Sequence, residues 1–199
     1  MTDNPRTHAS AAHFFKESSI ALLTLDGRLH AETLIASVSR MAGSLMYRSF
    51  GFDKAIEPGT PVLSEQANTH GPKLVSAMFA ILKELGHTLD ESNLNPEYLS
   101  PKFSLLTFKE SLDRLAPTFL KYCEVTPMTV QDAAIEAAIA AGFLVHRCGQ
   151  ILAVDKGGAI AVYGFVEGTK TAPFPVSSAG TPSRQPDTAK SKKPWYRVW

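Results

Sequence analysis

The sequence predicts a mainly α (α+β) fold: a single helical domain of about five helices with a C-terminal β-hairpin and a flexible tail. Apolar residues recur at helical spacing in several segments, β-rich runs flank a Gly-Gly pair, and Pro, Ser, Thr and Lys dominate after residue 168. The chain has 199 residues, 44% of them hydrophobic, which is enough for one core of ordinary size. We therefore expect a domain over 1–168, a linker over 169–193 and a separate motif over 194–199.

The first element expected is a helix over 8–25. Two adjacent phenylalanines, Phe14 and Phe15, and the apolar run at 20–25 can pack against a core. The Asp26-Gly27 pair is typical of a turn and ends this element. A short strand over 20–25 is the alternative interpretation.

The clearest helix is expected over 31–51. It carries an apolar stripe at spacings of four, three and four residues, made of Leu34, Val38, Met41 and Leu45. Small residues fill much of the remainder, including Gly43. Glycine inside a helix costs about 1 kcal/mol relative to alanine, so its presence predicts a close approach by another helix.

The middle of the chain alternates between loops and helices. Proline and glycine interrupt 57–72, and Pro72 suits the first turn of a helix over 73–86. A second loop is expected over 87–100. These two central loops are the place where a small-molecule site would be sought.

Two further helices are expected before the hairpin. Ser100-Pro101 resembles an N-cap followed by proline at the first helical position, so a helix should occupy 101–124. Pro117 lies inside this pattern and predicts a kink or two helices that meet there. An alanine-rich helix follows over 128–142.

A hairpin is expected over 150–168. β-rich runs lie on either side of residues 155–158, where Gly157-Gly158 favours a chain reversal. Two strands alone are marginally stable in water, so the hairpin should lie against the helices. Helix, turn, helix and hairpin would together resemble the order of a winged helix, but the second helix carries Asp132, Glu136 and alanines, which do not suit DNA.

No residue pattern predicts a catalytic, metal or cofactor site. His146 and Cys148 would share a face only in a strand, and Arg147 between them could lower the pKa of Cys148. Asp132 and Glu136 are four residues apart on a helix, a spacing more typical of a solvated face. We therefore predict no cofactor and no metal, and favour a non-enzymatic protein without excluding an enzyme.

The last part of the sequence differs from the body in charge and in aromatic content. From Thr169 onward it holds six basic residues and one acidic residue, a net charge of +5. The whole chain carries +1, so the preceding 168 residues carry −4. Both tryptophans lie in a terminal aromatic motif, made of Trp195, Tyr196, Arg197, Val198 and Trp199.

These residue types are the ones most enriched at the centres of protein interfaces, so the motif predicts a protein partner. Three lysines before it, Lys190, Lys192 and Lys193, would steer association electrostatically. Docking in cis, for instance on the hairpin edge, is the alternative to docking on another protein.

The leading hypothesis is a cytoplasmic adaptor or assembly subunit that recruits a protein through this motif. One alternative is a small enzyme or ligand-binding protein with its site in the loops 57–72 and 87–100. Another is a lipid or single-stranded nucleic-acid binder that uses the basic aromatic tail, although five net charges are few for that role. The sequence predicts no signal peptide and no membrane span, and it leaves oligomerisation open.

Overall fold

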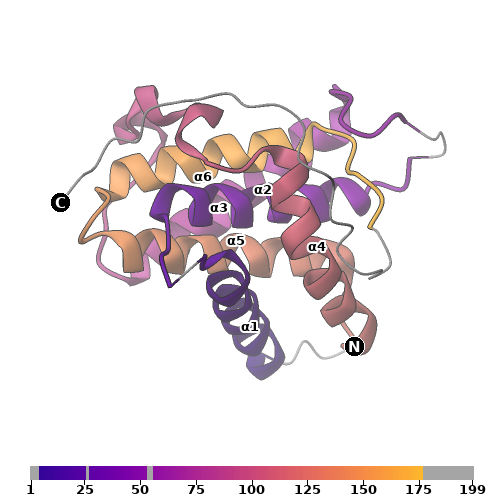
Figure 1. The fold of residues 1–199 in the computed structure, drawn as a ribbon, viewed down its shortest axis with the longest axis horizontal. Coiled ribbons are helices and arrows are strands. Elements are labelled where there is room, and N and C mark those ends of the chain that lie inside the picture. Colours follow the sequence, from indigo (N-terminus) through magenta and orange to yellow (C-terminus); the bar gives the residue numbers. More distant parts are fainter. Residues whose placement is uncertain (1–4, 26, 53–55, 177–199) are drawn as a thin grey trace, which may run out of the picture.

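Helix α2 (Ala31–Arg48) runs through the centre of the molecule, and every residue from Thr33 to Tyr47 is buried. The structure is a computed structural model that describes residues 5–25, 27–52 and 56–176. In Figure 1, α2, α5 and α6 cross the view nearly side by side, while α1 and α4 descend from them. Helix α2 contacts all five other helices, which is why small and apolar residues occupy its whole circumference.

Within the described ranges the fold is a single all-α domain of six helices. The other five are α1 (Pro5–Leu23), α3 (Glu65–Glu84), α4 (Phe108–Val125), α5 (Val130–Cys148) and α6 (Val154–Thr169). Three short 3-10 turns, η1 (Glu91–Asn93), η2 (Pro96–Tyr98) and η3 (Pro101–Phe103), connect α3 to α4. Extended pairing among these residues is limited to two isolated bridges, Leu25–Arg28 and Pro61–Thr171.

The predicted C-terminal hairpin over 150–168 is wrong. That segment forms α6, so the fold is all-α and has no wing of the winged-helix kind in the described residues. Gly157 and Gly158, which favoured a turn, instead lie inside the helix and face Val145 and Leu89, and two later glycines of the same helix face α2. A Cβ on Gly164 would lie 2.7 Å from the Ser39 Cβ, and one on Gly168 would meet the backbone carbonyl of Arg40. Glycine is used here for close helix packing rather than for chain reversal.

The prediction of close packing at Gly43 is confirmed. A Cβ at this position would lie 2.6 Å from the carbonyl oxygen of Phe165 and 2.7 Å from the backbone nitrogen of Thr169. Helices α2 and α6 therefore touch backbone to backbone. This contact overrides the low helix propensity of the glycines, since burial against a neighbouring helix outweighs a weak local preference.

Helix boundaries also differ from those expected. Helix α3 begins at Glu65, capped by Ser64, so Pro72 lies inside the helix rather than in its first turn. Helix α4 begins at Phe108 rather than at 101, and continues through Pro117 as one element. A proline removes one backbone donor, and the buried residues on either side of position 117 keep this helix packed against the core.

A buried arginine ties α2 to α6 and to the segment before α4. Arg40 is 1% exposed, and its Nε donates to Glu167 Oε2 at 2.6 Å. Its Nη1 donates to the Leu106 carbonyl at 2.7 Å and to the hydroxyls of Ser104 and Ser111 at 3.1 and 3.2 Å. A buried charge is tolerated because these partners replace the water that it loses.

Candidate functional site

The chain remains attached to the helical body after α6. The backbone nitrogen of Ala172 donates to the Thr60 carbonyl at 2.9 Å, and that of Gly59 donates to the Ala172 carbonyl at 2.8 Å. The guanidinium of Arg48 donates to the Phe174 carbonyl at 2.9 Å. Residues 170–174, which the sequence assigned to the linker, are thus bound to the segment that precedes α3.

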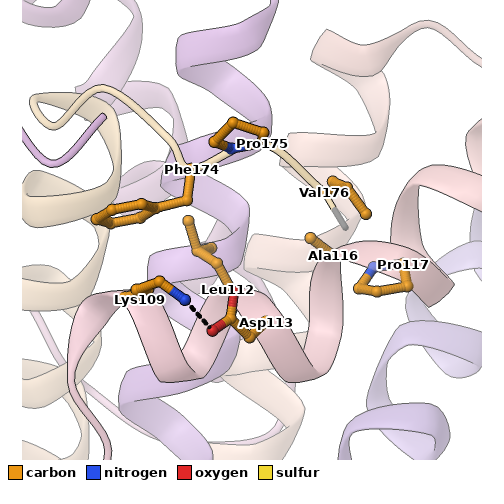
Figure 2. Close-up of a pocket in the computed structure, with 8 residues that line it drawn as sticks. All are labelled: Lys109, Leu112, Asp113, Ala116, Pro117, Phe174, Pro175 and Val176. Carbon is orange, nitrogen blue, oxygen red and sulfur yellow. Dashed lines mark hydrogen bonds and ion pairs between the residues drawn. The ribbon is translucent and has the colours of Figure 1, made fainter. Parts of the chain in front are cut away.

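The last described residues lie over α4. Figure 2 shows Phe174, Pro175 and Val176 above a recess of about 110 Å³ that α4 residues close from below. On its α4 side, Lys109 forms an ion pair of 2.5 Å with Asp113. The Lys109 ammonium also lies 5.6 Å from the centre of the Phe174 ring, a cation–π contact. The chain therefore leaves the body at the surface, beside α4.

The residues predicted to bind a partner lie outside the described residues. They are Trp195, Tyr196, Arg197, Val198 and Trp199, together with the lysines Lys190, Lys192 and Lys193. The partner site expected from sequence stays a prediction. The predicted cis-docking place does not exist, since the hairpin edge is replaced by α6.

One cavity brings together parts of both segments that the sequence assigned to central loops, although residues 65–72 of the first belong to α3. Its volume is about 450 Å³, and it lies between α3, α6 and the turns η1 and η2. Its apolar lining comes from all three sides and consists of Val75, Leu94, Leu99, Val162, Phe165 and Val166. Polar groups from Asn68, Glu91, Thr169 and Lys170 complete it. A mostly apolar cavity of this volume with a few polar groups is typical of a binding site.

The wall formed by residues 87–100 is fixed onto α6 by packing. A Cβ on Gly158 would lie 2.5 Å from Leu89 Cδ2 and 3.1 Å from Leu94 Cδ2. Glycine at this position therefore lets two leucines of the wall lie directly on α6. The rings of Tyr98 and Phe103 stack at 4.0 Å, and the Lys156 ammonium lies 5.1 Å from the Tyr98 ring.

The α3 wall of the cavity contains a backbone carbonyl, that of Asn68, which lacks its usual helical hydrogen-bond donor four residues later. Pro72 has no backbone N–H, so it cannot donate the helical hydrogen bond that the Asn68 carbonyl would otherwise receive. Asn68 and Pro72 both line the cavity. The sequence marked Pro72 as a helix breaker, whereas in the structure it lies inside α3 and lines the cavity together with Asn68.

His146 and Cys148, which would share a face only in a strand, lie on a helix, α5. Cys148 is buried there, and His146 pairs with His87 at 2.8 Å between ring nitrogens. Burial raises the pKa of the Cys148 thiol, and this effect exceeds the opposing effect of Arg147. Arg147 therefore does not activate this thiol, an alternative that the sequence left open.

The two carboxylates four residues apart, Asp132 and Glu136, lie in different environments. Asp132 accepts a hydrogen bond from the Thr129 hydroxyl at 2.6 Å near the start of α5, whereas Glu136 is buried. The prediction that both lie on a solvated face is wrong for Glu136. Among the described residues, no three His, Cys, Asp or Glu side chains gather as ligands of one metal ion.

Sequence inspection missed the Arg40–Glu167 pair and the Thr107–Glu110 capping box. A charged residue in the middle of an otherwise small and apolar helix was the available signal for Arg40. The four residues from Thr107 to Glu110 match the capping-box pattern that begins α4.

None of the helices in the described ranges combines the length and apolar character needed to cross a bilayer. Comparison of the chain with models of protein families, with curated proteins and with solved structures finds no match.

Proposed function

We propose that this protein is a non-enzymatic adaptor or assembly subunit of the cytoplasm that binds a protein partner through its terminal aromatic motif. One observation carries the proposal: both tryptophans of the chain lie within residues 195–199, next to a tyrosine and an arginine. Trp, Tyr and Arg dominate the energy of protein interfaces, and burial of each tryptophan would contribute roughly 2–3 kcal/mol.

The way the chain leaves the body supports this role. Arg48 and the contacts with residues 59–60 anchor the chain as far as Phe174, which is at the surface beside α4. Seventeen residues separate Val176 from Pro194. For a flexible chain of that length the root-mean-square reach is about 21–25 Å, so the motif can engage a second protein without displacing the body.

The test compares the full chain with a chain truncated after Lys193 in pull-downs from the native cell extract. A partner retained only by the full chain would be purified and its binding measured directly. A matched pair of variants separates the contributions: Trp195→Ala with Trp199→Ala removes the anchors, and Lys192→Gln with Lys193→Gln removes charge. We expect the first pair to abolish binding and the second to slow association.

Two results would contradict the adaptor proposal. If truncation loses no partner and lowers the melting temperature by several degrees, the tryptophans serve the domain's own stability. If binding to anionic vesicles or single-stranded nucleic acid falls steeply with salt, the tail acts through charge, since an aromatic protein contact is only weakly salt-sensitive.

The second candidate is a ligand-binding protein or small enzyme, and one specific observation favours it. Gly71 and Pro72 of α3 and Glu91 and Leu94 of the segment 87–100 line the same cavity of about 450 Å³. A ligand that binds there would raise the melting temperature with its concentration. Absence of any shift across a broad screen of apolar and amphipathic compounds would count against this candidate.

A further inference from the structure

The cavity between α3, α6 and the turns η1 and η2 has room for an aromatic side chain. Its volume is about 450 Å³, whereas the recess beside Phe174 measures about 110 Å³. Sites that enclose a sizeable organic group are usually at least about 300 Å³, a volume that this cavity exceeds. A neighbouring hollow beside Phe174 measures about 500 Å³, but three charged residues, Lys109, Glu167 and Lys170, line it. Leu94, Leu99, Val162 and Phe165 make the interior of the cavity between α3 and α6 apolar.

Its polar groups suit an indole. A buried tryptophan requires an acceptor for its ring N–H, because that donor would otherwise lose its hydrogen bond to water. Asn68 lines the cavity, and its carbonyl receives no helical hydrogen bond from Pro72. Glu91 supplies a carboxylate at the rim. Residues that carry acceptor oxygens thus line an otherwise mostly apolar cavity on two sides, Asn68 on α3 and Glu91 on η1.

Charge also favours a basic segment at this cavity. The wall over 87–100 contains Asp90, Glu91 and Glu97 and has no lysine or arginine. Of these acids, Glu97 lies 3.5 Å from the ammonium of Lys102. Lys170 lies in the cavity lining and the Lys156 ammonium lies 5.1 Å from the Tyr98 ring of this wall, so its acidic character is concentrated at Asp90 and Glu91. The terminal motif carries Arg197 and follows three lysines, so its charge complements this wall.

The motif is within reach of the cavity on the same chain. Val166 and Lys170 line the cavity, and they also line a neighbouring hollow to which Phe174 contributes. The point where the chain leaves the body is therefore adjacent to the cavity. The seventeen residues from 177 to 193 have a root-mean-square reach of about 21–25 Å, which covers that separation.

We propose that the terminal aromatic motif docks in cis in the cavity between α3, α6 and the turns η1 and η2, with a tryptophan ring against Leu94, Leu99 and Phe165. This proposal rests on the proposed role of the motif in binding. The domain then holds its own motif closed, and a partner must compete with the cavity for it. At an effective concentration of about 1 mM, an intrinsic dissociation constant of about 100 µM keeps about 90% of molecules closed.

Tryptophan fluorescence of the full chain tests this directly, because the only two tryptophans are Trp195 and Trp199. Emission wavelength and quenching by acrylamide report whether these rings are shielded. Leu99 is 40% exposed, so Leu99→Lys should fold while placing a cation at the cavity mouth. The matched control is Leu63→Lys, since Leu63 is 86% exposed and does not line the cavity.

We expect shielded tryptophans in the unmodified chain and in Leu63→Lys, at a level that does not change with protein concentration. Tenfold weaker docking in Leu99→Lys would lower the closed fraction from about 90% to about 50% and move emission towards that of exposed tryptophan. Circular dichroism establishes that each variant keeps its helices. If Leu99→Lys does not fold, Glu91→Lys, at the exposed rim of the cavity, replaces it as the test variant. It should weaken docking of the motif most strongly at low salt.

Three results would overturn the proposal. Tryptophans fully accessible to quencher in the unmodified chain would show that the cavity is empty or holds another molecule. Shielding that persists in the cavity variant would place the motif elsewhere. Shielding that disappears on dilution would show that a second copy provides the site. The adaptor proposal is judged separately by the truncation pull-down, so accessible tryptophans with loss of a partner on truncation would reject only the cis docking.

Discussion

Replacing Gly168 by alanine is expected to destabilise the protein, although alanine is the better helix former. A Cβ at Gly168 would meet the Arg40 carbonyl oxygen and would lie 2.9 Å from Gly43 Cα and from the Ser44 nitrogen. Carbon contacts are comfortable at about 3.5–4.0 Å, so α2 and α6 would have to separate by roughly 0.7 Å. All three neighbours are backbone atoms, which cannot rotate away as a side chain does.

The expected magnitude follows from two opposing effects. Alanine gains about 1 kcal/mol of helix propensity over glycine, whereas overpacking a core contact costs about 1–3 kcal/mol. Because the clash involves backbone on both helices, we take the upper part of that range and expect a net loss of about 1–2 kcal/mol. In a chain of this size each kcal/mol shifts the melting temperature by about 2–4 °C.

The assay is urea unfolding followed by circular dichroism, with Gly157→Ala as the matched control in the same helix. A Cβ on Gly157 would lie 3.2 Å from Val145 Cγ1 and 3.5 Å from Ile35 Cδ1, and both are side-chain methyl groups that can adjust. We expect Gly157→Ala to be at least about 1.5 kcal/mol more stable than Gly168→Ala. Equal stability of the two variants, or Gly168→Ala more stable than the unmodified protein, would refute the close packing of α2 and α6.

Three further predictions concern buried and capping groups. Glu167→Ala should lower the free energy of unfolding by about 2–4 kcal/mol, because it leaves the Arg40 guanidinium buried without its carboxylate. The double variant Arg40→Met with Glu167→Leu should recover most of that loss. Urea titrations measure both effects. Hydrogen bonds from Thr107 hold the pKa of Glu110 below its ordinary value near 4.5. The ionised Glu110 carboxylate therefore stabilises the folded protein above that pH, and this contribution is lost as pH falls through the lower pKa of the folded state. Glu110→Gln should flatten the dependence of the free energy of unfolding on pH in that range. The buried Cys148 thiol should react with a thiol reagent near neutral pH only at the rate of unfolding.

Each of these three has an outcome that would count against it. A single Glu167→Ala variant as stable as the double variant would mean that Arg40 finds other partners. An unchanged acid profile in Glu110→Gln would show that the capping box does not persist in solution. Labelling of Cys148 much faster than unfolding would indicate that the end of α5 opens locally.

The central helix and the approximate extent of the other early helices could be predicted because their signals are local. The stripe of Leu34, Val38, Met41 and Leu45 repeats at helical spacing, and all four side chains are buried in the structure. Gly43 indicated close packing for a reason that also depends on one position only, its low helix propensity. The loops around Pro61 and Pro96 likewise follow from residues that interrupt regular structure.

The last helix could not be predicted in the same way. Valine, tyrosine and phenylalanine together with Gly157-Gly158 favour strands and a turn when their local preferences are considered alone. In the molecule, Gly164 and Gly168 face α2, and Gly158 faces Leu89 and Leu94. The reason for each glycine thus lies more than 60 residues away in the chain, where no local pattern could reveal it.

The candidate site, like the fold, could be predicted from the sequence only in part. The sequence by itself determined the chemistry of the terminal motif, since Trp195, Arg197 and Trp199 have recognisable interface character wherever they lie. It also marked two central loops without relating them to each other. Only the tertiary structure decided that Pro72 and Leu94 line one cavity against α6, because packing of α3 and of residues 87–100 onto that helix joins surfaces that are distant in sequence.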